Sequence, residues 1–122
     1  MATVKSFREL LVWQRGMELT SAIYRLTREF PKEELFGLSS QLRRAAVSIP
    51  SNIAEGQGRI SRGEFIQFLG IARGSNFEVQ TQIELVKELG YGSTASIGGC
   101  ERLSSEVGRM LNGLIGSLIE SD

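Results

Sequence analysis

A proline inside a long amphipathic pattern constrains this chain more than any other feature. From Leu38 to Arg59, apolar residues recur every three or four positions, which places them on one face of an α-helix. Pro50 lies in the middle of this pattern, has no N–H to offer the carbonyl of Ala46, and crowds that carbonyl with its ring. We therefore predict one helix that bends near Ala46 and continues through Pro50. Ser51 or Asn52 is expected to bond the freed carbonyl.

The preceding helix is predicted to run from about Ser6 to Glu29, because the residue before Pro31 avoids helical geometry. Its apolar residues fall on two faces rather than one. The first face is expected in a core, and the second carries Leu10, Trp13, Met17 and Tyr24. A helix that is apolar on two sides is typical either of a deeply buried helix or of one that also contacts a partner chain.

The third helix has the clearest start signal in the sequence. Ser61 and Glu64 have the spacing of a capping box, and Ile60 and Phe65 have the spacing of the hydrophobic staple that spans it. An apolar stripe continues to Val86, and Gly90 follows as a C-terminal stop. We therefore predict a helix of about 28 residues, roughly 42 Å long at 1.5 Å per residue.

The fourth helix has the weakest start. Residues 93–96 offer N-caps without a capping box, and Gly98 and Gly99 each cost about 1 kcal/mol in a helix interior. This helix is therefore expected to be firm only from about Glu101. Four amphipathic helices with short connections and no strand pattern predict an all-α fold. We expect an antiparallel up-and-down four-helix bundle with a proline-kinked second helix, in a single domain spanning residues 1–122.

Composition argues against several kinds of active site. The chain has no histidine, which removes the commonest general base, the commonest zinc ligand and the Glu-x-x-His pattern of di-iron bundles. The single Cys100 cannot form an internal disulfide and is expected to be a small buried apolar residue. Three serines have no base to activate them as nucleophiles: Ser48, Ser51 and Ser75. We expect a protein that is not an enzyme, with no catalytic residue, cofactor or metal.

No apolar run approaches the length of a membrane span, and the first ten residues lack the apolar core of a signal peptide. A cytoplasmic location with no membrane partner is therefore expected.

Charge is balanced overall but uneven along the chain. Fourteen basic and fourteen acidic side chains cancel, so no net field attracts nucleic acid. Eleven of the basic residues are arginines, which suit phosphate contacts and salt bridges alike. A stretch around the second helix and the start of the third is locally positive, and its arginines are the candidate RNA-binding residues: Arg43, Arg44, Arg59, Arg62 and Arg73. Under the alternative interpretation, these arginines pair with Glu78, Glu84 or Glu88 across subunit contacts.

The third helix also carries an apolar pair away from its core stripe, Ile66 and Phe77. Together with the second face of the first helix, this pair would expose an apolar surface unusual for a monomer. We therefore expect a homo-oligomer whose interface includes Leu10, Trp13, Met17, Tyr24, Ile66 and Phe77. These faces argue for assembly but do not give the number of copies.

Four segments of the chain resemble the 23S rRNA intervening-sequence protein family: residues 11–19, 37–59, 61–75 and 87–91. The most specific is the run Ser-Ile-Pro-Ser-Asn-Ile-Ala-Glu-Gly at residues 48–56. The resemblance implies bacterial four-helix bundles, some encoded inside insertions of large-subunit rRNA genes. It also implies a ring-shaped homopentamer and similarity to the accessory protein of diversity-generating retroelements, a basic pentamer that binds RNA and reverse transcriptase. The family offers no catalytic residues to carry over, and its molecular role is largely unassigned.

Two functional hypotheses follow from the sequence. The first is a non-enzymatic oligomeric module that binds RNA or a ribonucleoprotein partner through its arginines. The alternative is a protein-only homo-oligomeric scaffold whose arginines pair with glutamates between subunits. Salt-dependent retention of RNA distinguishes the two.

Overall fold

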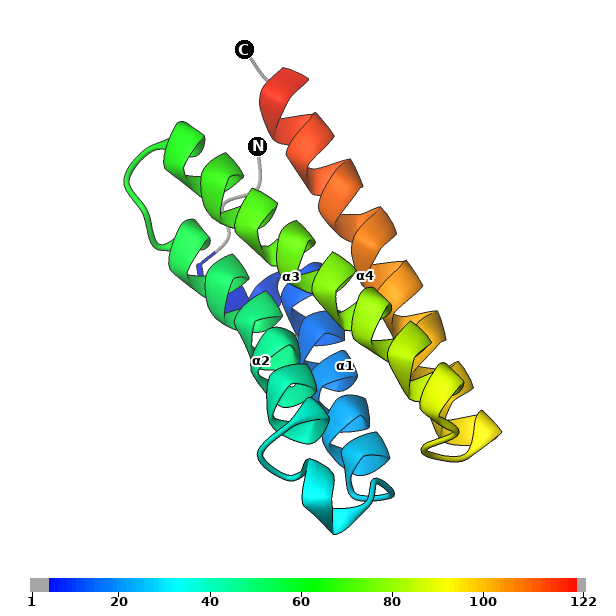
Figure 1. The fold of residues 1–122 in the computed structure, drawn as a ribbon. Helices are drawn as coiled ribbons and strands as arrows, with labels where there is room; N and C mark the ends of the chain where they lie inside the picture. The colour runs from blue at the N-terminus through cyan, green and yellow to red at the C-terminus, as the bar shows by residue number, and fades with distance from the viewer. Residues whose placement is uncertain (1–4, 121–122) are drawn as a thin grey trace.

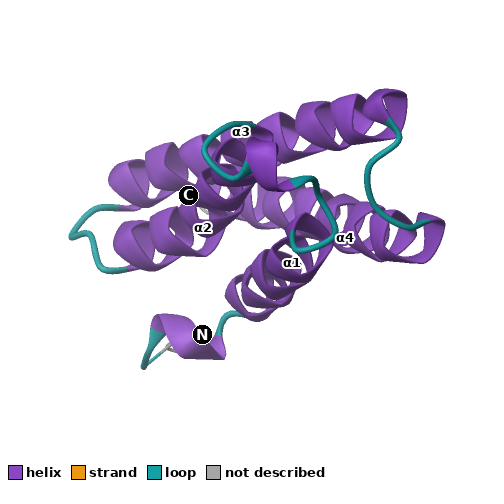
Figure 2. Cartoon of the chain, turned by 60° about the horizontal axis from the view of Figure 1, so that its bottom comes forward, coloured by secondary structure: helices purple, strands orange, loops and turns teal. Residues whose placement is uncertain are grey.

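The computed structural model describes residues 5–120, which form a four-helix bundle. The helices are α1 (Leu11–Thr27), α2 (Leu38–Gln57), α3 (Arg62–Leu89) and α4 (Thr94–Glu120), with short 3₁₀ helices η1 (Phe7–Glu9) and η2 (Lys32–Glu34). The helices pack in a cycle, α1 against α2, α2 against α3, α3 against α4, and α4 against α1 (Figure 1). Within the described part of the chain there are only helices and the loops that join them (Figure 2). The predicted all-α bundle is confirmed.

The core is formed by the apolar face of each helix. The largest fully buried side chains come from all four helices: Leu19, Ile23, Leu26, Leu42, Ile49, Ile53, Leu69, Val79, Ile83, Val86, Val107 and Leu111. Helices α3 and α4 have 28 and 27 residues, whereas α1 has 17. The C-terminal end of α4 therefore extends past the start of α1 (Figure 1).

Helix α2 continues through Pro50, as predicted. The carbonyl of Ala46, to which Pro50 cannot donate, accepts a hydrogen bond from the neighbouring helix instead. The Thr20 hydroxyl of α1 lies 3.1 Å from the Ala46 carbonyl oxygen and 2.8 Å from the carbonyl oxygen of Gly16. The hydroxyl proton is shared between these two acceptors and replaces the bond that the proline removes. This contact is stabilising, since a buried carbonyl without a hydrogen-bond partner is costly.

The donor to the Ala46 carbonyl differs from the prediction. We expected Ser51 or Asn52 to bond the freed carbonyl, but the Asn52 amide donates instead to the carbonyl of Ser48, at 2.8 Å. A bond between helices requires that α1 and α2 lie close together. The buried Gly16 lies at this contact, where an added Cβ would come within ordinary contact distance of Ile49 Cγ2 (3.4 Å) and Pro50 Cβ (3.6 Å).

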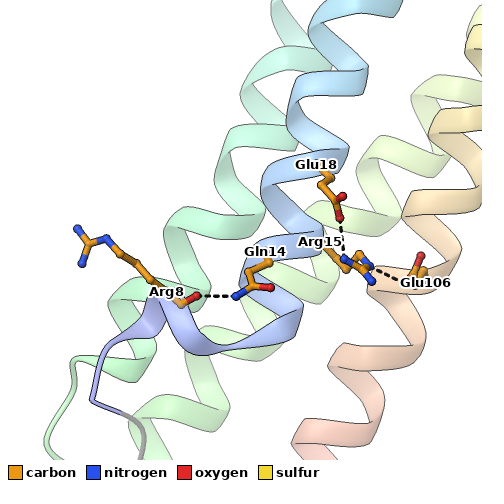
Figure 3. A network of polar contacts seen from close by, with 5 residues as sticks. All are labelled: Arg8, Gln14, Arg15, Glu18 and Glu106. Carbon is orange, nitrogen blue, oxygen red and sulfur yellow. Dashed lines mark hydrogen bonds and ion pairs between the residues drawn. The ribbon is translucent and has the colours of Figure 1, made fainter.

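The first helix is shorter than the predicted Ser6–Glu29. Leu10 is extended, with φ −71° and ψ 122°, so η1 is separated from α1. The Gln14 amide donates to the carbonyl of Arg8 at 2.9 Å and thereby joins η1 to α1 (Figure 3). Periodicity did not reveal this break, because the apolar pattern continues across it.

The start of α3 matches the prediction in part. Ser61 is the N-cap, and its Oγ accepts a hydrogen bond from the backbone N–H of Glu64 at 3.1 Å. The predicted hydrophobic staple was wrong, because the Ile60 side chain is fully exposed and packs against nothing.

Helix α4 is helical from Thr94, so the prediction that it frays before Glu101 was wrong. Ser93 Oγ accepts from the backbone N–H of Ser96 at 3.1 Å. The Glu29 carboxylate, which follows α1, accepts from the Ser93 backbone N–H at 2.7 Å and from the Ser96 hydroxyl at 2.5 Å. A carboxylate at a helix N-terminus is also stabilised by the positive end of the helix dipole. The residue that secures this helix lies more than 60 positions away in the sequence, which local patterns cannot show.

A second contact joins the same two connections. The Tyr91 hydroxyl donates to Glu34 Oε2 at 2.9 Å, and Glu34 Oε1 accepts from the backbone N–H of Leu38 at 3.1 Å. The rings of Phe30 and Tyr91 lie 5.4 Å apart between centroids. The α1–α2 and α3–α4 connections are thus held together at one end of the bundle.

Replacing Thr20 with valine preserves the side-chain shape but removes the hydroxyl that bonds Ala46. We expect the free energy of unfolding to fall by about 1–3 kcal/mol, measured by urea titration. Thr20→Ser is the matched control, because it keeps the hydroxyl and loses only a methyl group. An equal loss in both variants would contradict the role of the hydrogen bond.

The Glu29 contact makes the free energy of unfolding depend on pH in the acid range. The hydrogen bond from Ser96, followed by that from the Ser93 backbone, lowers the pKa of Glu29 below its ordinary value. The contribution is therefore complete above the unfolded-state pKa and is lost as the pH falls through the folded-state value. We expect the urea midpoints of wild type and Glu29→Gln to differ at pH 7 and to converge toward pH 3. A difference that stays constant over this range would contradict the assignment.

Candidate functional site

The five candidate arginines occupy three separate places. Arg43 and Arg44 lie in the first half of α2, Arg59 and Arg62 lie at the α2–α3 turn, and Arg73 lies on α3 beside α4. From Arg44 to Arg59 the chain rises roughly 22 Å at 1.5 Å per residue. One bundle therefore does not bring the five together on a single surface.

Two of these arginines are engaged with neighbours at the far end of α2 and on α3. Arg59 Nη2 pairs with Glu55 at 3.1 Å, and its guanidinium lies 4.7 Å from the ring centroid of Phe68. Arg73 Nη1 donates to the side-chain oxygen of Asn112 at 3.1 Å. These contacts connect α2 to α3 and α3 to α4, so both arginines have a structural role in the bundle.

Arg43 and Arg44 differ in their surroundings. Arg43 Nε donates to the Thr27 hydroxyl at 2.8 Å, and its guanidinium lies 4.6 Å from the ring centroid of Tyr24. Arg44 is exposed, and no residue between 5 and 120 forms a hydrogen bond or ion pair with it. Arg44 is therefore available to a partner outside the chain.

Both arginines line a groove between α1 and α2 with a volume of about 630 Å³, here called the α1/α2 groove. Its apolar side chains are unusually exposed, with Phe36 94% and Leu35 52% accessible. The remaining lining residues are Tyr24, Ser40, Val47 and Ser48. Aromatic and arginine side chains gathered on one surface are typical of protein interfaces.

A second groove, here called the α3/α4 groove, lies on the opposite side of the helix cycle and has a volume of about 500 Å³. Its lining residues are Phe77, Gln80, Thr81, Ile83, Glu84, Glu101 and Ser105. Glu84 and Glu101 share one ammonium, because Lys87 Nζ lies 2.9 Å and 2.7 Å from their carboxylates. Two carboxylates against one lysine leave this groove acidic, whereas the α1/α2 groove is basic.

The predicted interface residues divide into exposed and half-buried sets. Met17, Tyr24 and Phe77 are exposed, with Phe77 57% accessible, whereas Leu10 and Trp13 pack against the core. Ile66 is half-buried. Sequence reasoning missed Leu35 and Phe36, because they lie in a connection where helical periodicity does not apply. The signal available was a pair of large apolar residues inside a polar turn.

Polar pairs between helices fix the relative heights of α2, α3 and α4. The hydroxyls of Ser48 and Ser75 lie 2.8 Å apart between α2 and α3. The Asn76 amide donates to the Ser104 carbonyl at 3.0 Å, and the Ser104 hydroxyl donates to Asn76 Oδ1 at 2.8 Å. Asn76, a polar residue on an apolar stripe, therefore sets the register of α3 against α4.

A third polar contact joins α1 to α4 (Figure 3). Arg15 Nε donates to Glu106 at 2.7 Å, and its Nη1 lies 2.9 Å from Glu18 on the same helix. All four neighbouring helix pairs are thus joined by at least one side-chain hydrogen bond, so the grooves lie on a bundle of defined register.

Among the described residues, the one thiol is buried and the carboxylates do not gather into a metal-binding group. Cys100 is buried, and burial raises the pKa of its thiol to about 11. Among residues 5–120 there is no group of three or more Cys, Asp or Glu side chains that could hold a metal ion. No helix in the same span is long and apolar enough to cross a membrane.

Comparison with known proteins decides the family. The sequence profile of the 23S rRNA-intervening sequence protein family matches residues 8–113. The chain belongs to this family. A crystal structure of a protein of unknown function from the S23 ribosomal protein family of Bacteroides thetaiotaomicron is similar to it, with a TM-score of 0.80 and 27% sequence identity. The match covers 87% of this chain and 96% of the other. No curated protein matches the chain.

Membership of the 23S rRNA-intervening sequence protein family confirms the resemblance drawn from residues 48–56 and the neighbouring segments. It supplies a fold and a group of relatives but no activity, because the similar solved structure is itself described as a protein of unknown function.

The burial of Cys100 predicts a thiol that reacts slowly with disulfide reagents. With a pKa of about 11, about one thiol in a thousand is ionised at pH 8, and the side chain is also shielded from solvent. A disulfide reagent such as Ellman's reagent should therefore react far more slowly with the native protein than with the protein in urea. Similar rates in both conditions would show that Cys100 is accessible in the folded chain.

Proposed function

We propose that the chain is a non-enzymatic interaction module that assembles with copies of itself. The observation that carries this proposal is the pair of grooves on opposite sides of one bundle, one apolar and basic, the other acidic with the exposed Phe77 in its lining. Exposed apolar surface is unfavourable in water by about 25 cal/mol per Å². Association of copies would remove the exposed parts of Leu35, Phe36 and Phe77 from water.

Glycines on the outer side of α3 support assembly independently. Gly63, Gly70 and Gly74 lie on the helix face opposite the core stripe, and a Cβ added to any of them would meet nothing within 4 Å. Gly70 and Gly74, in the interior of α3, each cost about 1 kcal/mol relative to alanine, and no contact within the described chain requires any of the three glycines. Close approach of a second chain gives these glycines a physical reason. For the number of copies we propose five, on the family resemblance alone.

RNA binding is the second candidate function. It is favoured by the exposed Arg59 and Arg62 at the α2–α3 turn, which cyclic assembly would repeat around one rim of the oligomer. Weak phosphate contacts repeated in this way give a multivalent site even though the chain has no net charge.

Assembly predicts a mass well above that of one chain. Light scattering coupled to size exclusion at micromolar concentration should return a multiple of 13.4 kDa, and the multiple should persist on tenfold dilution. A mass equal to one chain would rule out the proposed function.

RNA binding predicts a salt-dependent affinity. In a filter-binding titration the log–log slope should be about −0.7 for each phosphate neutralised on a single strand. Arg59→Ala with Arg62→Ala should flatten this slope while leaving the oligomer intact. Arg102→Ala with Arg109→Ala, two exposed arginines on α4, is the matched control. Absence of retention at low salt would remove RNA binding as a function.

A further inference from the structure

We infer that the α1/α2 groove of one copy receives Phe77 of the next copy, with Arg44 of the first facing Glu101 of the second. This inference rests on the proposed self-assembly and names the two surfaces that meet. The contact joins two different faces of the chain, so every copy in the assembly offers one groove and one Phe77.

The two surfaces lie at the same height on the bundle. The Ser48–Ser75 contact aligns α2 with α3, which run antiparallel, so Phe77 lies level with Ala46, next to Val47. On α1, Thr20 contacts the Ala46 carbonyl, which places the start of the groove at this level too. Two bundles standing side by side with parallel axes would therefore bring Phe77 opposite the groove without a shift along the axis.

The charged residues align in the same way. Counting from Ser48–Ser75 places Arg44 level with Val79 on α3. Counting from Asn76–Ser104 then places Val79 level with Glu101 on α4. Arg44 and Glu101 are thus at one height on opposite sides of the molecule, and side-by-side copies would bring them together.

The chemistry of the surfaces is complementary. Phe77 is 57% exposed, and the groove offers it the aromatic ring of Tyr24 and the apolar side chain of Val47. The groove is lined by two arginines and no acidic residue, whereas Glu84 and Glu101 have one lysine between them. An ion pair at such a contact would be partly desolvated, which strengthens it and fixes the orientation of the partner.

A second copy fits these observations better than RNA does. Half of the groove lining is apolar: Tyr24, Leu35, Phe36 and Val47. Phosphate contacts would engage the arginines but leave Leu35 and Val47 without a partner. The chain itself carries the matching aromatic residue and carboxylates, at the matching height. A contact between unlike faces with no axial shift can also repeat around a rotation axis and close into a ring.

The test uses two variants that each disable one face. Phe77→Ser removes the inserted side chain, and Val47→Arg fills the groove. Both positions are exposed in the single chain, so both variants should fold. Each variant alone should be monomeric. An equimolar mixture should form a dimer and stop there, because the Val47→Arg chain still offers Phe77 and the Phe77→Ser chain still offers a groove.

Matched controls use exposed apolar residues outside both grooves. Ile60→Ser and Leu11→Arg replace side chains that are 101% and 52% exposed, and both should keep the wild-type mass. Arg44→Glu should weaken assembly by about tenfold or more, and adding Glu101→Arg should restore it in part.

The outcomes separate the two levels of the proposal. A monomeric wild type would overturn self-assembly itself. An oligomeric wild type with variants that remain oligomeric, or monomeric variants that do not form a dimer on mixing, would overturn this inference alone. Arg44→Glu that abolishes RNA retention and leaves the oligomer intact would assign the groove to RNA and also overturn it.

Discussion

The hydrogen bond between Thr20 and the Ala46 carbonyl joins α1 to α2 at the point where Pro50 leaves α2 one backbone bond short. Pro50 removes a bond from the middle of α2, and a hydroxyl on α1 replaces it. A break at Pro50 would have separated Arg44 and Val47 from the end of the helix that packs against the start of α3.

A continuous α2 gives the register of the other helices a fixed reference. Ser48 sets the height of α3 through Ser75, and Asn76 then sets the height of α4 through Ser104. These contacts are worth about 1 kcal/mol each as hydrogen bonds, but sliding a helix would leave their buried partners unsatisfied at greater cost. The positions of both grooves follow from this register.

The sequence predicted the elements well where the signal was local. The helix through Pro50 and the Ser61 cap were both anticipated from neighbouring residues. Two of the failures depend on residues distant in the sequence, whereas the break at Leu10 and the exposed Ile60 are local features that periodicity and spacing did not reveal. Glu29 secures the start of α4, and Thr20 bonds Ala46, and neither contact leaves a trace in the local pattern of the segment it stabilises.

The same limit explains what the sequence could say about the candidate site. Tyr24 and Phe77 were identified as off-core apolar residues by periodicity, and both lie at the grooves. Phe36 was missed, since it lies in a connection. The five arginines, which fall between residues 43 and 73, are spread over three places because α2 is long enough to separate Arg44 from Arg59. Proximity in sequence overstated proximity in space.

A cross-link between two copies tests the proposed contact between the two grooves most directly. In a Cys100→Ala background, one chain carries Ser40→Cys in the α1/α2 groove and the other carries Thr81→Cys in the α3/α4 groove. Mild oxidation of the mixture should yield a disulfide-linked pair containing one chain of each kind. The control pair, Ser51→Cys with Ser117→Cys at exposed positions outside both grooves, should yield much less. Equal yields from both pairs, or no mixed product from an oligomeric sample, would contradict the proposed contact.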